Sequence, residues 1–252
     1  MRFKDKVAII TGGNRGIGKG ISLRLAKEGA KIVIVARNEA AAKNVVTEIQ
    51  GYGQECIFIK TDVCNKREVD AMVETVINLY GKVDILVNNA AVLIRCPFLE
   101  LTEEIWDKTI NINLKGYFLC AQAVAKEMVK REKGGKIVNI TSVQGITVWT
   151  PFFHAPHEVS KAGIIMLTKQ LAYELAPYGI NVNAVGPGAT ETKLLEKVAK
   201  DSEKIKSLTK NIPLGRVAKP SDIAGAVAYL SSEDAYYVTG VTLFVDGGRL
   251  TW

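Results

Sequence analysis

Short apolar runs alternate with segments of helical pattern along the whole chain, and this alternation most constrains the fold. The runs are continuous in Val and Ile rather than interleaved with polar residues, which indicates strands buried on both faces. Such strands, linked by helical crossovers, predict a doubly wound parallel sheet with helices on both sides. The seven predicted strands are residues 7–10, 31–36, 56–60, 84–87, 136–140, 181–185 and 241–245.

Helical patterns fill the intervals between these strands. They cover residues 16–28, an Ala-rich stretch ending at residue 50, residues 66–80, and two long segments at 107–130 and 159–176. A chain of 252 residues suits one α/β domain, and no linker, repeat or low-complexity segment divides it. The sequence therefore predicts a single domain over residues 1–252.

Charge and cysteine usage narrow the class of protein. The formal net charge is +7, but acidic residues lie between the basic ones, which argues against a nucleic-acid partner. No signal-peptide core begins the chain, and no apolar run approaches the ~20 residues that span a bilayer, so we expect a cytoplasmic protein without a membrane partner. The four cysteines are scattered, which favours buried free thiols over a metal site.

A glycine-rich turn follows the first predicted strand and opens the first helix. Its sequence is Thr-Gly-Gly-Asn-Arg-Gly-Ile-Gly, from Thr11 to Gly18. Glycines allow a close backbone approach, and a helix N-terminus offers unpaired N–H groups to a pyrophosphate. A turn of this kind can also serve only to connect strand and helix. The candidate cofactor-binding residues here are Gly12, Asn14, Arg15, Gly16, Ile17 and Gly18.

The Gly-x-x-x-Gly-x-Gly spacing resembles the short-chain dehydrogenase/reductase family. The run Asn88-Asn89-Ala90-Ala91 and the segment from Pro187 to Thr192 extend the resemblance over nearly the full chain, with Ala91 replacing the family's Gly. It implies a Rossmann fold and hydride transfer between a nicotinamide cofactor and a carbonyl or secondary alcohol, as in glucose dehydrogenase-like and 3-oxoacyl-carrier-protein reductase-like members. The further implied cofactor contacts are Asp62, Val63, Asn89, Ala90, Lys161, Pro187, Gly188, Thr190 and Thr192.

The end of the second strand bears on the choice between NAD and NADP. An enzyme that prefers NAD usually places Asp or Glu there to bind the ribose 2′-hydroxyl. This chain has Arg37 instead, whose planar guanidinium suits a 2′-phosphate, and Arg15 lies in the glycine-rich turn. Each Arg alone is typical of a solvated surface. Together, with the acid missing, they favour NADP over NAD.

The resemblance also implies the catalytic residues Asn113, Ser142 and Lys161, in that order along the chain. In the family, Ser binds the substrate oxygen, Lys holds the ribose and lowers the pKa of a Tyr, and Asn supports a water relay. The Tyr belongs four residues before Lys161, where this chain has His157. No Tyr occurs between Ser142 and Lys161, so a shifted alignment does not supply one.

Imidazole differs from phenol in reach and in proton affinity. Its ordinary pKa near 6.5 suits a base at neutral pH, whereas Lys161 one helical turn away disfavours the imidazolium that an acid requires. Its ring ends roughly 2 Å short of a phenol oxygen, and a 1 Å misplacement can cost about 10²-fold in rate. Three interpretations remain open: His157 is the working acid/base, or it weakens an ordinary enzyme, or the chain binds cofactor without turnover.

The segments around His157 and after Pro187 do not identify the substrate, and the oligomeric state is only implied by the resemblance. His154 is interpreted as a loop residue, with substrate contact as the alternative; a metal site with His157 lacks a clear third ligand. A substrate lid is expected at about residues 189–212, a Lys-rich stretch that suits either a solvated face or an acidic substrate, while Trp149, Phe152 and Phe153 suggest an apolar wall. The resemblance implies a homotetramer through the two long helices. The two function classes are an NADP(H)-linked oxidoreductase and a catalytically silent NADP(H) sensor or scaffold.

Overall fold

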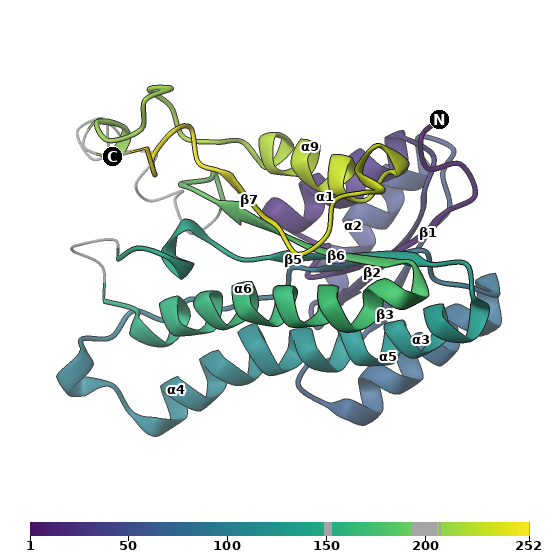
Figure 1. The fold of residues 1–252 in the computed structure, drawn as a ribbon, viewed down its shortest axis with the longest axis horizontal. Coiled ribbons are helices and arrows are strands. Elements are labelled where there is room, and N and C mark those ends of the chain that lie inside the picture. Colours follow the sequence, from purple (N-terminus) through teal and green to yellow (C-terminus); the bar gives the residue numbers. More distant parts are fainter. Residues whose placement is uncertain (149–152, 193–205, 207, 252) are drawn as a thin grey trace.

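Seven strands form one sheet in which every neighbouring pair is parallel (Figure 1). The computed structural model describes residues 1–148, 153–192, 206 and 208–251. The strand order is β3-β2-β1-β4-β5-β6-β7. Strands are added toward one side of the sheet from β1 to β3 and toward the other side from β4 to β7, which confirms the doubly wound Rossmann-like fold. The strands are β1 (Val7–Thr11), β2 (Lys31–Ala36), β3 (Cys56–Lys60), β4 (Ile85–Asn88), β5 (Gly135–Ile140), β6 (Ile180–Pro187) and β7 (Thr242–Val245).

Helices cover both faces of the sheet. Helices α1, α2 and α9 pack on one face, and α3, α5 and α6 pack on the other, as Figure 1 shows. Their bounds, with that of α4, are α1 (Gly16–Lys27), α2 (Glu39–Gln50), α3 (Lys66–Tyr80), α4 (Glu103–Ile110), α5 (Gly116–Arg131), α6 (Ala155–Leu175) and α9 (Pro220–Leu230).

The two cores explain why the strands read as continuous apolar runs. Successive side chains of a strand point to opposite faces. In β1, Ala8 and Ile10 belong to the core under α1, α2 and α9, whereas Val7 and Ile9 belong to the core under α3 and α5. All four residues are at most 1% exposed, so a central strand has no polar face.

The long helix expected over residues 107–130 is wrong in its bounds and in its continuity. The segment begins four residues earlier, as α4, and a π-helical turn, η2 (Asn111–Lys115), separates α4 from α5. A π turn inserts one extra residue into the helix and is frequent at functional sites. Here it carries Asn113, whose side chain is fully buried.

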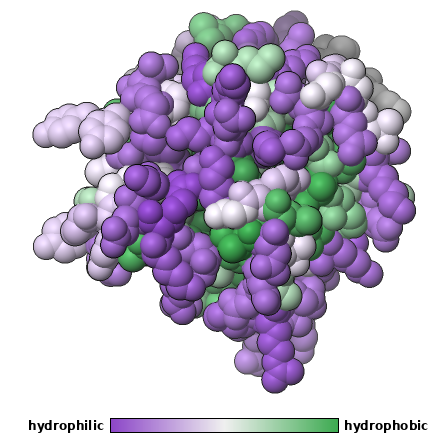
Figure 2. Space-filling view, turned by 90° about the vertical axis from the view of Figure 1, so that its right-hand side faces the viewer, coloured by the Kyte–Doolittle hydropathy of each residue, from purple (hydrophilic) through white to green (hydrophobic). Residues whose placement is uncertain are grey.

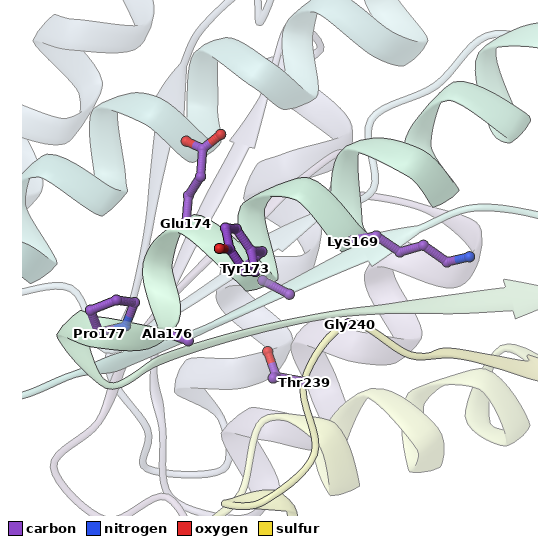
Figure 3. A pocket seen from close by; sticks show the side chains of 8 residues that line it. Lys169, Tyr173, Glu174, Ala176, Pro177, Thr239 and Gly240 are labelled. Carbon is purple, nitrogen blue, oxygen red and sulfur yellow. The ribbon is translucent and has the colours of Figure 1, made fainter.

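The carboxyl ends of the strands meet at one edge of the sheet, on the left in Figure 1, and the amino ends meet at the opposite edge. The candidate site lies at the carboxyl edge. An open groove of about 690 Å³ lies elsewhere, between the end of α6 and the loop before β7. Figure 3 shows Tyr173 and Glu174 on the helical side of this groove and Thr239 on the loop side. It contains none of the predicted site residues.

Two further expectations can be compared with the described residues. All four cysteines are free; Cys56 and Cys120 are buried, whereas Cys64 and Cys96 are only partly so. Within residues 1–148, 153–192, 206 and 208–251, no helix combines the length and apolar character that a membrane crossing needs.

Candidate active site

The glycine-rich turn packs against the loop after β4. Asn89 donates from Nδ2 to the backbone oxygens of Thr11 (2.9 Å) and Gly12 (3.3 Å), and Thr11 Oγ1 accepts from the backbone N–H groups of Asn89 and Ala90. A Cβ on Gly18 would lie 2.1 Å from the Gly12 oxygen, and one on Gly12 would lie 2.9 Å from Asn89 Nδ2. These two glycines are therefore required for the turn to close.

The same turn leaves the start of α1 open to an anion. The helix begins at Gly16, the Arg15 side chain makes no cap bond, and no acidic residue stands in the first turn. Uncapped N–H groups at a helix start attract a phosphate. Asn14 is 8% exposed and lies 3.4 Å from the backbone oxygen of Asn38, so it links the turn to the end of β2. Ile17 packs on the core and anchors the helix.

The segment after β6 reaches the glycine-rich turn. Pro187 ends β6, and Thr190 Oγ1 donates to the backbone oxygen of Gly188 at 3.0 Å. Gly16 has a φ of +50°, and a Cβ there would lie 3.2 Å from the Thr192 methyl group. The turn and the Pro187–Thr192 segment, far apart in sequence, thus form one cleft at the carboxyl edge.

The end of β2 has no acid of its own, but Arg37 faces an acid that follows the neighbouring strand β3. Arg37 is exposed, and its guanidinium lies 3.8 Å from a carboxylate oxygen of Asp62, which follows β3. Asp62 also caps the backbone N–H of Cys64. Next to it, the hydroxyl of Thr61 is buried without a hydrogen-bond partner among the described residues, while Val63 packs on Gly116. An orphaned buried hydroxyl fits a polar ligand at this place.

Asn113 joins three segments of the catalytic region. Its Oδ1 accepts from the Val92 N–H at 2.8 Å, and its Nδ2 lies 2.9 Å from the Val92 oxygen. The same Nδ2 lies 3.2 Å from Ser160 Oγ and 3.4 Å from His157 Nδ1. The π turn therefore positions the Asn113 side-chain amide so that it contacts both the loop after β4 and helix α6. The Nδ2 group has two protons, and its two shorter contacts are those to Val92 and Ser160, so the contact with Nδ1 does not fix the tautomer of His157.

Lys161 is buried beneath the end of β5. It is 3% exposed, and its ammonium donates to the Ile140 backbone oxygen at 2.7 Å. The Tyr117 hydroxyl donates to the same oxygen at 3.1 Å, and its ring centroid lies 5.3 Å from the ammonium. Burial lowers the pKa of Lys161 to about 7. The ammonium therefore loses its proton near neutral pH, far below the ordinary pKa of a lysine.

Ser142 stands between the end of β5 and the start of α6. Its neighbour Thr141 donates to the Lys161 backbone oxygen at 2.7 Å, which fixes this corner to α6. Ser142 Oγ accepts from the backbone N–H of Gln144 at 3.1 Å. An accepting hydroxyl still carries its own proton, so Ser142 retains a donor for a substrate oxygen.

His154 is not an ordinary loop residue. It directly precedes α6 and is 4% exposed. The Gln144 amide nitrogen lies 3.3 Å from its Nδ1, and a Glu158 carboxylate oxygen lies 3.5 Å from the same atom. Its ring packs edge-on against His157, with centroids 5.8 Å apart. Sequence reasoning missed Gln144 and Glu158, because only packing against His154 distinguishes them from solvated residues.

Burial decides the charge of His157. The residue is 8% exposed, and its burial, with Lys161 and His154 acting in the same direction, lowers its pKa to about 3. The repulsion by Lys161 agrees with the sequence-based expectation, but burial is the larger cause. Imidazole is therefore neutral at physiological pH. The ordinary imidazole pKa near 6.5, which suggested a base at neutral pH, is therefore not the pKa of His157 in the folded protein.

Part of the predicted substrate region lies outside the described residues. This holds for Trp149 and Phe152 and for residues 193–205 and 207 of the expected lid at 189–212. Phe153, which is described, is exposed.

The chain belongs to the short-chain dehydrogenase/reductase family. The matching family model, described as enoyl-(acyl carrier protein) reductase, covers residues 12–249. The fold and the order of the site motifs agree with this assignment, and the chain is accordingly a member of an oxidoreductase family.

Individual relatives match over nearly the full length. A 3-oxoacyl-[acyl-carrier-protein] reductase of Synechocystis sp. is 41% identical, with 97% of each chain covered. Dehydrogenase/reductase SDR family member 4 of Pongo abelii is 40% identical, covering 97% of this chain and 87% of the relative. The solved structure of a putative 2-deoxy-D-gluconate 3-dehydrogenase from Agrobacterium tumefaciens, with bound NADP, has a TM-score of 0.90 and is 35% identical. The match covers 99% of this chain and 98% of that structure's chain.

Proposed function

We propose that this protein transfers a hydride between NADP(H) and a carbonyl or secondary alcohol, with His157 in place of the usual phenol. The observation that carries the proposal is a chain of contacts. Asn113 contacts His157 and the loop after β4, which packs on the glycine-rich turn, and the Lys161 backbone oxygen accepts a hydrogen bond from Thr141, the neighbour of Ser142. A protein that only binds a nucleotide does not need Ser142 with a free donor next to α6. The 3-oxoacyl reductase and gluconate dehydrogenase names of the relatives suggest a 3-oxoacyl thioester or a sugar acid as substrate.

The residues present fit a dinucleotide. The uncapped start of α1 would hold the pyrophosphate, with Thr192 beside it. Asp62, Val63 and the unpartnered Thr61 hydroxyl would border the adenine, and Lys161 would hold the nicotinamide ribose. The bound nucleotide supplies or accepts the hydride.

We assign the preference for NADP to Arg37 and Arg15. Both residues are exposed, Arg15 in the turn after β1 and Arg37 directly after β2. The ion pair of Arg37 with Asp62 is long and solvated, so it costs little to exchange it for a 2′-phosphate. The NADP bound to the Agrobacterium structure supports the same preference.

Ser142 and His157 would hold the substrate oxygen. In its neutral tautomer with the proton on Nε2, His157 would donate to a carbonyl oxygen and polarise it without giving up its proton. Ser142 would donate a hydrogen bond from its hydroxyl to the same oxygen. Asn113 fixes the ring through Nδ1 and fixes the wall of the cleft through Val92. After hydride transfer the alkoxide would take its proton from the small imidazolium population of His157, which is the step that this arrangement serves least well.

The second candidate is a silent NADP(H) sensor or scaffold. The specific observation in its favour is the pKa of about 3 for His157, which removes proton exchange at neutral pH. In this case the cleft would bind the cofactor without turnover, and a protein partner would bind differently to the cofactor-bound and the cofactor-free forms.

The two candidates differ in one assay. NADPH consumption is followed with a panel of 3-oxoacyl thioesters, ketones and sugar acids, for the protein and for His157→Tyr. Turnover by the wild-type protein supports the oxidoreductase, whereas turnover by the Tyr form alone contradicts the proposal and identifies a site disabled at one position. NADPH binding without turnover by either form contradicts the proposal and supports the sensor.

We also propose self-association through the face of α6 that its neighbours leave exposed. Val159, Met166 and Tyr173 recur every seven residues along α6 and are 48%, 64% and 82% exposed, and Phe118 of α5 is 42% exposed. An apolar stripe of this kind is typical of a protein interface. Light scattering should give the mass of a tetramer, and Met166→Lys should shift it to smaller species. A monomeric wild-type protein would contradict this assembly.

A further inference from the structure

The amino edge of the sheet, opposite the candidate active site, contains a small polar pocket. It lies where β4, β5 and β6 begin and α5 ends, and its volume is about 70 Å³. Figure 2 looks onto this side of the molecule, where hydrophilic side chains surround a smaller apolar area. One water takes about 30 Å³ of liquid volume, so the pocket has the size of two waters or of one tetrahedral oxyanion.

Positive charge exceeds negative charge in the lining. The cations are Lys6, Arg131, Lys133 and Lys136, and the acids are Asp84 and Glu233. The Asp84 carboxylate is already satisfied, because it accepts from the Val7 N–H at 2.8 Å and from Arg131 at 2.8 Å and lies 3.1 Å from the Lys82 ammonium. Glu233 is exposed and lies 3.6 Å from Lys6. The remaining positive charge has no matching acid in the pocket.

Lys136 is the most buried of these cations. It is 7% exposed, and its ammonium contacts neutral groups: Asn181 Oδ1 at 2.7 Å and the Tyr236 ring, whose centroid is 5.6 Å away. Burial lowers its pKa. A buried ammonium is stable when it meets an anion, and this one donates a single hydrogen bond to a neutral oxygen among the described residues.

Two buried polar atoms in the lining have no partner among the described residues. They are the Nε of Arg131 and the hydroxyl of Ser231, a residue that is only 4% exposed. Both can donate a hydrogen bond, but each atom is enclosed and meets a bound anion only after its side chain turns toward the pocket. Native structures leave few such atoms unsatisfied, and a functional ligand is one reason for an exception.

From the surplus charge, the volume and the two orphaned donors, we infer that this amino-edge pocket binds one small tetrahedral oxyanion of the phosphate type. Lys136 supplies the charge, and Arg131 and Ser231 supply hydrogen bonds once their side chains turn toward the anion. Because Lys136 and Asn181 belong to β5 and β6, a bound anion links the starts of the strands that lead to Ser142 and Pro187. Binding to the folded chain alone raises its stability.

Calorimetric titration with inorganic phosphate at constant ionic strength tests this site. It is run with and without saturating NADPH, since the start of α1 also attracts phosphate. We expect one saturable site that persists with NADPH, and a dissociation constant raised at least about tenfold by Lys136→Met, which removes a charged donor. Ser231→Ala should weaken binding by a smaller factor. Lys126→Gln, an exposed change of equal charge on α5, is the matched control and should leave binding unchanged.

Three outcomes overturn the inference: no saturable binding, binding that NADPH abolishes, or binding that neither Lys136→Met nor Ser231→Ala weakens. Circular dichroism of each variant checks its fold, and Ser231→Ala serves alone if Lys136→Met does not fold. A parallel titration with glycerol 3-phosphate separates the two sources of the anion. Equal affinity for the ester indicates the phosphate group of a metabolite, and binding of inorganic phosphate alone indicates the free ion.

Discussion

The replacement His157→Tyr gives the sharpest test of the proposed chemistry. With a pKa of about 3, only about one His157 in 10⁴ carries the acidic proton at pH 7. General acid catalysis contributes typically 10²–10⁴-fold to a rate. We therefore expect the Tyr form to reduce a ketone substrate with a kcat/KM about 10²–10⁴-fold above that of the wild-type protein at pH 7.

The pH dependence gives an independent measure of the same effect. If the rare imidazolium delivers the proton, the wild-type kcat/KM rises about tenfold for each unit by which the pH falls between roughly 8 and 5, because the imidazolium population does so. The Tyr form lacks this slope. Lys161 titrates in both proteins, near a pKa of about 7 in the wild type, so the ratio of the two profiles largely cancels its effect.

The assay is initial-rate NADPH consumption over this pH range, with His157→Phe as the control that keeps a buried ring and removes the donor. His157→Phe should fall below the wild-type protein at every pH. A wild-type-to-Tyr ratio that is close to one and independent of pH would refute the reasoning from the burial of His157.

Three other predictions follow from the described contacts. Arg37→Ala should raise the dissociation constant for NADPH about tenfold and leave that for NADH nearly unchanged, as fluorescence titration would reveal, because a charge-assisted contact to the 2′-phosphate is lost. Asn113→Ala should lower the free energy of unfolding by about 1–3 kcal/mol in a urea titration, since both backbone groups of Val92 lose their partner; an unchanged midpoint would contradict this. The pKa of His157 is lowered in the folded state, so as the pH falls the unfolded chain takes up this proton at a higher pH than the folded chain does. The free energy of unfolding therefore decreases as the pH falls from about 6.5 toward 3. Between pH 7 and 5 the wild-type protein should lose about 2 kcal/mol more than His157→Phe, and equal losses would argue against a buried neutral ring.

The strands were predictable because their residue types alone indicate burial on both faces of the sheet. Continuous Val and Ile runs located all seven to within two residues at each end, since no polar face had to be assigned. The helix over residues 66–80 agrees at both ends, because Asn65 caps its start and Gly81, with positive φ, ends it. Local chemistry determines these elements, so the sequence alone sufficed.

The π turn was not predictable, because no residue type in Asn111–Lys115 distinguishes it from an ordinary helix. It depends on the partners that Asn113 finds in Val92 and Ser160. The burial of His154 depends in the same way on Gln144 and Glu158. The pKa of His157 follows from how deeply the ring is enclosed, which spacing along the chain does not reveal.

The contacts of His157 have a genetic consequence. The family resemblance predicts a Tyr at this position, where the His157 ring contacts Asn113. The codons for Tyr and His differ by a single pyrimidine transition at their first base. A single-nucleotide mutation is therefore enough to convert His157 to the Tyr that the resemblance predicts.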